Sequence, residues 1–86
     1  MKLLYCKNCH DIFRLTGRMR YCSCKKIKGK YINSLDAIYY GDTAIPIGFD
    51  NSSFREAIAV PPIEEPSIMF GAFIIPEKCS TFRKIE

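Results

Sequence analysis

The chain has 86 residues, 48% of them hydrophobic and 26% charged, which is the length and composition of one small globular domain and excludes an intrinsically disordered chain. Residues 1–31 hold nine Lys or Arg residues and one acidic residue, Asp11, a balance of +8, whereas residues 32–86 carry −4. No apolar run approaches the roughly 20 residues of a membrane span, and the N-terminus has only a three-residue apolar run where a secretory signal needs roughly 7–15, so we expect a cytoplasmic protein without membrane contact.

Four cysteines near the N-terminus form the most specific motif. Two residues separate Cys6 from Cys9, one separates Cys22 from Cys24, and twelve lie between the pairs. Paired cysteines at this spacing are typical of a tetrahedral thiolate site for Zn²⁺, and a reducing cytoplasm favours a metal over disulfides. The sequence therefore predicts one structural zinc ion bound by these four cysteines. Four thiolates and the ion would lower the formal charge of the chain from +4 to about +2.

Other interpretations of the same residues are weaker. Residues 6–10 also match the Cys-x-x-Cys-His pattern of c-type haem attachment, and Cys-x-x-Cys alone occurs in redox proteins, but neither pattern explains the second pair. His10 directly follows Cys9, and adjacent side chains diverge, so we expect a surface histidine rather than a ligand. Cys79 lies 55 residues beyond Cys24 and is expected to be a packing residue or an unpaired thiol rather than a fifth ligand.

The strands are predicted from local composition. Residues 12–16 and 19–22 flank a turn at Gly17, which predicts a β-hairpin between the two cysteine pairs. Residues 37–40 and 44–49 follow as two strands joined at Gly41-Asp42. Pro46 has no N–H group, which predicts that the strand over residues 44–49 is irregular or lies at a sheet edge.

A short helix is predicted over residues 53–60. Ser52 and Ser53 are competing N-caps, and a pair of prolines ends the helix. Phe54 and Ile58 lie on one face of it. Because two helical turns are unstable alone in water, we expect this face to be buried against a sheet.

The C-terminal third contains a connector and two strands. Residues 61–66 are rich in proline and glutamate, residues 68–75 form a nearly unbroken apolar run, and residues 81–85 alternate. The apolar run predicts a central strand covered on both faces, and the alternation predicts a final, half-exposed strand. The expected fold is a single small α+β domain over residues 1–86. It comprises a zinc-bound N-terminal hairpin of the zinc-ribbon type (residues 1–31) and a β-rich portion (residues 32–86) with a mainly antiparallel sheet and one short helix.

Basic and aromatic residues are interleaved in the N-terminal segment. Lys and Arg bind phosphates or acidic protein surfaces, and tyrosine rings stack on unpaired bases. The residues expected to contact a partner are Arg14, Arg18, Arg20, Tyr21, Lys25, Lys26, Lys28, Lys30 and Tyr31. The alternative is that these aromatic rings pack around the metal and the lysines offset its negative charge.

Two resemblances extend these expectations. The cysteine pattern in residues 1–31 resembles zinc-ribbon and zinc-knuckle modules, which implies a metal-stabilised docking unit. Residues 41–54, GDTAIPIGFDNSSF, resemble short uncharacterised proteins encoded by tailed phages. This second resemblance implies a bacterial host cytoplasm and an accessory role, such as inhibition of a host defence.

The sequence favours binding over catalysis. It contains no recognisable catalytic motif, and four sulfur ligands leave zinc no open position for a reacting water, so we expect a protein that is not an enzyme. The leading hypothesis is a zinc-stabilised binding module that docks on a host protein or nucleoprotein complex. The alternative is a regulator that binds nucleic acid directly through its basic N-terminal segment.

Overall fold

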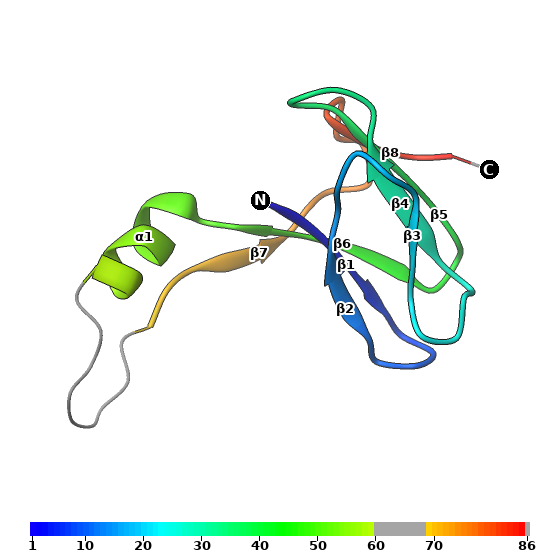
Figure 1. Ribbon diagram of the computed structural model, residues 1–86, viewed down its shortest axis with the longest axis horizontal. Helices are drawn as coiled ribbons and strands as arrows, with labels where there is room; N and C mark the ends of the chain where they lie inside the picture. Colours follow the sequence, from blue (N-terminus) through cyan, green and yellow to red (C-terminus); the bar gives the residue numbers. More distant parts are fainter. Residues whose placement is uncertain (60–68, 86) are drawn as a thin grey trace.

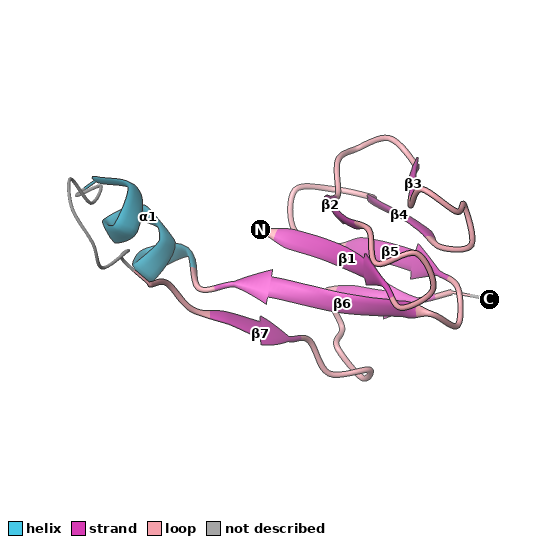
Figure 2. Ribbon diagram, turned by 90° about the horizontal axis from the view of Figure 1, so that it is seen from below, coloured by secondary structure: helices cyan, strands magenta, loops and turns pink. Residues whose placement is uncertain are grey.

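The computed structural model describes residues 1–59 and 69–85, whose strands form two four-stranded sheets (Figures 1 and 2). Sheet A has the strand order β2 (Ile12–Arg14), β1 (Lys2–Cys6), β6 (Ala44–Phe49) and β7 (Ala72–Ile74). Sheet B has the order β3 (Arg20–Tyr21), β4 (Lys28–Tyr31), β5 (Ala37–Tyr40) and β8 (Phe82–Lys84). Strands β5 and β8 are parallel and the other pairs antiparallel. With one helix in the described residues, α1 (Asn51–Ala59), this confirms the prediction of a small fold with mainly antiparallel sheets.

The hydrophobic core lies between the sheets and includes part of the cysteine cluster. Leu4 from sheet A, Phe82 from sheet B and Ile27 from the loop before β4 are fully buried. Cys6 and Cys22 are buried in the same core. The predicted strands at residues 37–40, 44–49 and 81–85 are confirmed as β5, β6 and β8.

Gly29 in β4 allows the two sheets to approach each other closely. A Cβ atom at this position would lie 2.8 Å from Leu4 Cδ1 and 3.0 Å from the Ile38 carbonyl oxygen, whereas a Cβ at Gly17 would meet nothing within 4 Å. We expect Gly29→Ala to lower the free energy of unfolding by about 1–3 kcal/mol through overpacking. Gly17→Ala should leave it unchanged or raise it by up to about 1 kcal/mol. Urea unfolding followed by circular dichroism measures both, and equal stabilities would contradict the close sheet packing.

The predicted hairpin of residues 12–16 and 19–22 is wrong. Strand β2 pairs with β1, with Phe13 opposite Leu4, whereas β3 pairs with β4 in the other sheet. The tight turn after Cys6 returns the chain directly onto β1, and the stretch around Gly17 then crosses from sheet A to sheet B. This crossing is held by a hydrogen bond from the Tyr31 N–H to the Thr16 carbonyl oxygen (2.8 Å).

The apolar run at residues 68–75 is not the predicted central strand. Among the described residues, β7 pairs with β6 alone, at the edge of sheet A, and all three of its residues are exposed. Residue 68 and the predicted connector at residues 61–66 lie outside the described part of the chain.

Strand β6 is an inner strand, so the predicted edge position for the strand containing Pro46 is also wrong. The Ile75 N–H donates to the Pro46 carbonyl oxygen (2.9 Å). In an antiparallel pair, the nitrogen and the carbonyl of one residue face the same neighbour. The proline nitrogen therefore faces Ile75, where the reciprocal hydrogen bond is missing and where β7 has already ended.

Helix α1 begins at Asn51, two residues before the predicted start, and residue 60 lies outside the described chain. The Phe54 N–H donates to the Asp50 carbonyl oxygen (3.0 Å), so Asp50, rather than either predicted serine, precedes the first turn. Ser53 lies within that turn, and its hydroxyl oxygen accepts the Gly71 N–H (2.8 Å). Ser53, a predicted N-cap, therefore connects the helix to the residue that precedes β7 instead of capping the helix.

The predicted burial of Phe54 and Ile58 against a sheet is wrong. No residue of α1 is buried, and the Ile58 side chain is 59% exposed. Phe54 is half-buried against Phe49 and Phe70, with ring centroids 5.3 and 4.8 Å away, at the end of the β6–β7 ribbon. We call residues 49–59 and 69–74 the arm and the two packed sheets the body. The arm projects from the body, which gives the molecule a long axis of 45 Å (Figure 1). In the described chain, no helix has the length and apolar character needed to cross a membrane.

Candidate metal centre

The four predicted cysteines converge in the structure. Cys6 ends β1, Cys9 follows in the next turn, and Cys22 and Cys24 lie in the loop between β3 and β4. Their Sγ atoms all lie within 4.8 Å of one another, and Cys24 Sγ is 3.7 Å from Cys6 Sγ and 3.4 Å from Cys22 Sγ. A tetrahedral site with Zn–S bonds of about 2.3 Å needs sulfur atoms about 3.8 Å apart. The cysteines form no disulfide, and their spacing fits a metal.

The two cysteine loops share one backbone pattern. In each, the N–H of the first cysteine donates to the carbonyl oxygen five residues later, and the N–H of the residue after the second cysteine donates back to the first cysteine's carbonyl oxygen. The bonds are Cys6 to Asp11 (2.9 Å) and His10 to Cys6 (2.8 Å), then Cys22 to Ile27 (3.2 Å) and Lys25 to Cys22 (3.0 Å). The shorter spacing of the second pair therefore still produces an equivalent loop.

His10 and Lys25 complete these loops with left-handed backbone conformations. Their φ angles are 64° and 62°, and they are the non-glycine residues with positive φ in the described chain. This conformation is costly for residues with a Cβ atom, so the surrounding contacts must enforce it. Each residue directly follows the second cysteine of its pair. This indicates that the left-handed conformation turns the chain so that both sulfur atoms of the pair point toward the cluster.

Two polar residues that the sequence did not identify support the cluster. The Asp11 carboxylate accepts hydrogen bonds from the Ser23 N–H (2.9 Å) and hydroxyl (3.1 Å), which connects the first loop to the second. The Thr43 hydroxyl lies 3.5 Å from Cys6 Sγ. Asp11 was visible as the one acidic residue in a basic segment, whereas Thr43 comes from the turn before β6 and had no sequence signal.

Local hydrogen bonds favour the thiolate forms of two cysteines. The Thr43 hydroxyl, together with the backbone N–H groups of Cys9 and Asn8, lowers the pKa of Cys6 to about 6 against the opposing effect of burial. The Asn8 side chain and the Lys26 N–H lower the pKa of Cys24. At Cys9, a backbone hydrogen bond from Asp11 is outweighed by burial and by the neighbouring Cys24 and Cys6 sulfurs, which raise its pKa. Because the thiolate is the form that binds metals, the fold favours the charge state that a cation requires at Cys6 and Cys24.

His10 and Cys79 do not contribute to the four-sulfur group. The exposed His10 ring is hydrogen-bonded through Nδ1 to the Tyr5 hydroxyl (2.6 Å). Cys79 is half-buried, and its Sγ lies 3.4 Å from the Thr81 hydroxyl.

Two of the predicted partner-binding residues connect the sheets instead. The Arg20 guanidinium of sheet B donates to the Arg14 carbonyl oxygen of sheet A (2.8 Å) and lies over the Phe13 ring. The Tyr31 hydroxyl of sheet B accepts the Lys2 N–H of sheet A (3.2 Å). Arg20 and Tyr31 therefore have structural contacts within the body.

Other predicted residues gather on the side of sheet B that faces away from sheet A. Tyr21 pairs with Lys28, which pairs with Tyr40, so their side chains share one face. Lys28 Nζ lies 5.7 Å from the centroid of the Tyr21 ring and 4.8 Å from that of Tyr40. Lys30 and Arg83 flank Ile38 on the same face. We call this surface the outer face: Tyr21, Lys28, Lys30, Tyr40 and Arg83.

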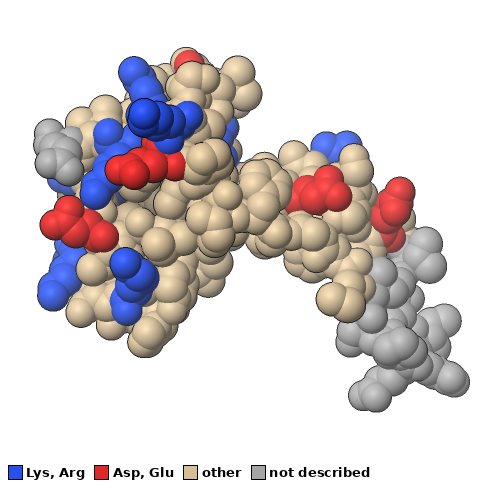
Figure 3. Space-filling view, turned by 180° about the vertical axis from the view of Figure 1, so that it is seen from behind, with Lys and Arg blue, Asp and Glu red and all other residues tan. Residues whose placement is uncertain are grey.

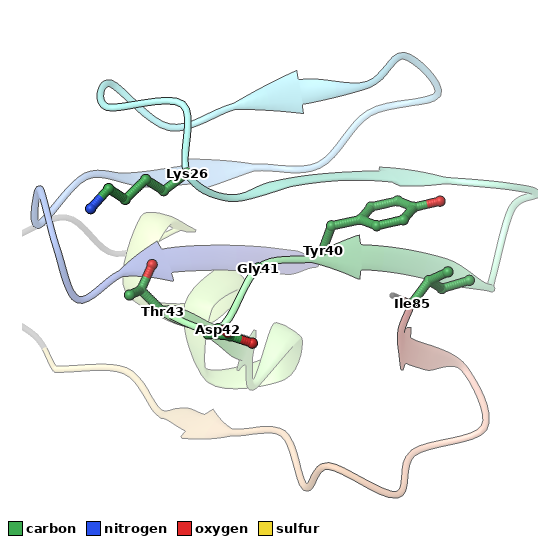
Figure 4. Close-up of a pocket in the computed structure, with 6 residues that line it drawn as sticks. All are labelled: Lys26, Tyr40, Gly41, Asp42, Thr43 and Ile85. Atoms are coloured by element: carbon green, nitrogen blue, oxygen red, sulfur yellow. The ribbon is translucent and has the colours of Figure 1, made fainter.

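An open hollow of about 600 Å³ adjoins the outer face. Its lining residues are Lys26, Tyr40, Gly41, Asp42, Thr43 and Ile85. Figure 4 shows Lys26 and Thr43 at one end of the hollow and Tyr40 and Ile85 at the other. Thr43, which lines the hollow, also contacts Cys6, so the hollow lies beside the metal centre as well as the outer face.

The remaining predicted residues, Arg14, Arg18 and Lys25, are exposed, on β2, in the turn around Gly17 and in the second cysteine loop. Lys and Arg side chains gather over the body, with few on the arm (Figure 3).

Comparison with known proteins finds no family model, no curated protein and no solved structure that matches this chain. The functional inference therefore rests on the cysteine cluster and the outer face.

Proposed function

We propose that the protein is a non-catalytic binding module whose body is stabilised by one structural Zn²⁺ ion. The observation that carries this proposal is the convergence of four cysteine Sγ atoms, all within 4.8 Å of one another, between the two sheets. Four thiolates form a soft ligand set that selects zinc over hard cations, and they complete its coordination shell without an open position. The two equivalent loops support the resemblance to zinc knuckles.

The docking surface that we propose is the outer face with the adjoining hollow. It carries the cations Lys28, Lys30 and Arg83, with Lys26 at the hollow. Asp42, also at the hollow, is paired with Lys84 (3.4 Å). Such a surface complements an acidic patch on a protein or nucleoprotein complex. The resemblance of residues 41–54 to phage-encoded proteins supports a host component as the partner.

Direct binding of single-stranded nucleic acid is the second candidate. Two tyrosines among cations are the components of a base-stacking surface. However, Lys28 already lies over both rings, so a base would have to displace it before stacking. This arrangement supports docking on a protein over direct stacking of bases.

The two candidates differ in their response to salt and nuclease. For a protein partner, capture from a bacterial lysate should survive nuclease treatment. It should be lost in the Lys28→Glu, Lys30→Glu double variant and retained in Arg18→Glu, which reverses a charge outside the outer face. For direct binding of single-stranded nucleic acid, fluorescence anisotropy should give a log–log salt slope of roughly −3 to −4 with about four to six phosphate contacts, from about −0.7 per contact on a single strand. A steep slope at micromolar affinity would replace the first candidate by the second.

A further inference from the structure

Exposed apolar side chains are concentrated on the arm. Half of the exposed large hydrophobic residues in the described chain belong to it: Ile58, Met69, Phe70, Phe73 and Ile74. Phe73 is 53% and Ile74 64% exposed, although both lie in a β-strand. Exposed apolar patches of this kind mark interaction sites on small domains. The arm is therefore a second surface, separate from the metal centre and the outer face.

Strand β7 has one backbone edge without a partner among the described residues. The Ile75 N–H donates to Pro46, and the Gly71 carbonyl oxygen accepts the Asp50 N–H (2.8 Å), so the odd-numbered residues of this segment direct their backbone groups toward β6. Ala72 and Ile74 consequently direct their N–H and C=O groups away from the sheet. These donors and acceptors alternate along a strand that is open to another chain.

We propose that a second copy of this chain pairs with the free edge of β7, antiparallel and related by a twofold axis at Phe73. In this register, Ala72 of each copy lies opposite Ile74 of the other. Each such pair exchanges both of its N–H···O bonds, because these are the residues whose backbone groups face outward. Phe73 then lies beside Phe73 of the second copy in a non-hydrogen-bonded pair, where side chains approach most closely.

The self-complementary edge favours a second copy over another partner. The pattern of free groups matches itself under a twofold rotation, as an isologous interface requires. No charged residue lies between Met69 and Pro76, so identical strands meet without repulsion. In proteins that stay monomeric, an exposed edge strand usually carries a charged residue or a β-bulge that prevents pairing with another chain. The cationic body lies toward the other end of the 45 Å axis, which keeps the two bodies apart.

The Phe73 ring lies on the β6 side of β7, away from the free edge. It lies against Gly48 on β6, where an added Cβ atom would be 2.7 Å from the ring. Glycine at this position therefore makes room for the ring over β6, so the ring does not block the free edge of β7. Little side-chain freedom remains to be lost when a second copy binds, which favours association.

Sedimentation velocity of the zinc-loaded protein, from about 5 to 500 µM, tests the proposal, since small interfaces of this kind are weak. The mass should rise with concentration from 9.9 kDa toward twice that value. Ile74→Lys should weaken association about tenfold or more, because it places a charge in the pairing register. Ile58→Lys is the matched control: it removes a similarly exposed side chain from the same arm, away from the edge, and should change the dissociation constant by less than about twofold.

A mixing experiment tests the register. Ala72→Glu should weaken self-association as Ile74→Lys does. Mixing these two variants should restore association as a heterodimer, since positions 72 and 74 of the two copies lie opposite each other and opposite charges attract. Native mass spectrometry resolves the heterodimer by mass, and zinc content with circular dichroism confirms that each variant retains its body.

Three outcomes would overturn the proposal. If the wild-type chain stays monomeric at about 500 µM, the free edge of β7 does not bind a second copy of this chain. Equal weakening by Ile58→Lys would indicate non-specific apolar association. Failure of the mixed variants to associate would exclude this register. The proposal does not depend on the function assigned to the outer face.

Discussion

Replacement of Cys22 by serine is expected to abolish stoichiometric zinc and to unfold the body. Cys22 is buried in the core between the sheets, and its Sγ is one of four at metal-binding spacing. Structural zinc contributes apparent binding energies of about 10–16 kcal/mol in zinc-finger peptides, comparable to the whole stability of about 5–15 kcal/mol of a typical domain. Without the ion, four polar thiol groups would be clustered at the core with no partner of sufficient strength.

Elemental analysis and urea unfolding measure this effect. Wild-type protein purified without added metal should contain about one zinc per chain, and a chelator should remove its cooperative unfolding transition. Cys79→Ser is the matched control, because Cys79 is half-buried and contacts Thr81 outside the cluster, so both zinc content and stability should be retained. An unchanged urea midpoint in metal-free wild-type protein would show that the ion does not stabilise the fold.

The cysteine cluster and several strands could be predicted because their signals are local. Close pairs of cysteines limit where the sulfurs can lie, and the turn at Gly41 and Asp42 separates two segments of strand composition. The pairing of the N-terminal strands could not be predicted in the same way. Residues 12–16 could pair across the turn at Gly17 or across the loop after Cys6. The loop after Cys6 is closed by its own hydrogen bonds, so these residues pair with β1.

The errors on the arm have a different cause. An apolar run and an amphipathic helix normally predict burial, because exposing them to water is unfavourable. Here β7 and Ile58 remain exposed among the described residues. The pattern identified apolar surface correctly but could not distinguish burial within the chain from burial against another molecule. For β7, the failed prediction and the proposed dimer therefore rest on the same residues, whereas Ile58 lies outside the proposed edge.

The residues of the outer face were predicted only in part, within a larger set of basic and aromatic residues that had no assigned surface. The sequence placed nine residues in one group, and strand pairing divided them. Arg20 and Tyr31 connect the two sheets, whereas Tyr21 and Lys28 share a face with Tyr40. Arg83, from the last strand, joins this face through its register with Ile38. Contacts between strands this far apart in sequence depend on the fold and leave no local pattern.

Phe82→Ala is expected to lower the free energy of unfolding by about 3–5 kcal/mol, the usual cost of truncating a buried phenylalanine. Phe82 is fully buried and packs edge-on against Tyr39, with ring centroids 5.1 Å apart and an interplanar angle of 80°. It also anchors β8, which returns the chain from the arm and, in the described part of the chain, lies at the edge of sheet B beside β5. Loss of the ring would leave a cavity in the core and weaken the attachment of the whole C-terminal segment.

Arg83→Ala provides the control for this substitution, since the next residue of the same strand is exposed and should change stability by no more than about 0.5 kcal/mol. Urea unfolding of the zinc-loaded proteins measures both variants, and their zinc content shows whether the metal centre survives. A loss below about 1 kcal/mol for Phe82→Ala would mean that the core collapses onto the vacated space or that β8 does not hold the body together. If Phe82→Ala loses about 3–5 kcal/mol of stability, as expected, but keeps its zinc, the metal centre and the C-terminal strand stabilise the body independently, one from each end of the chain.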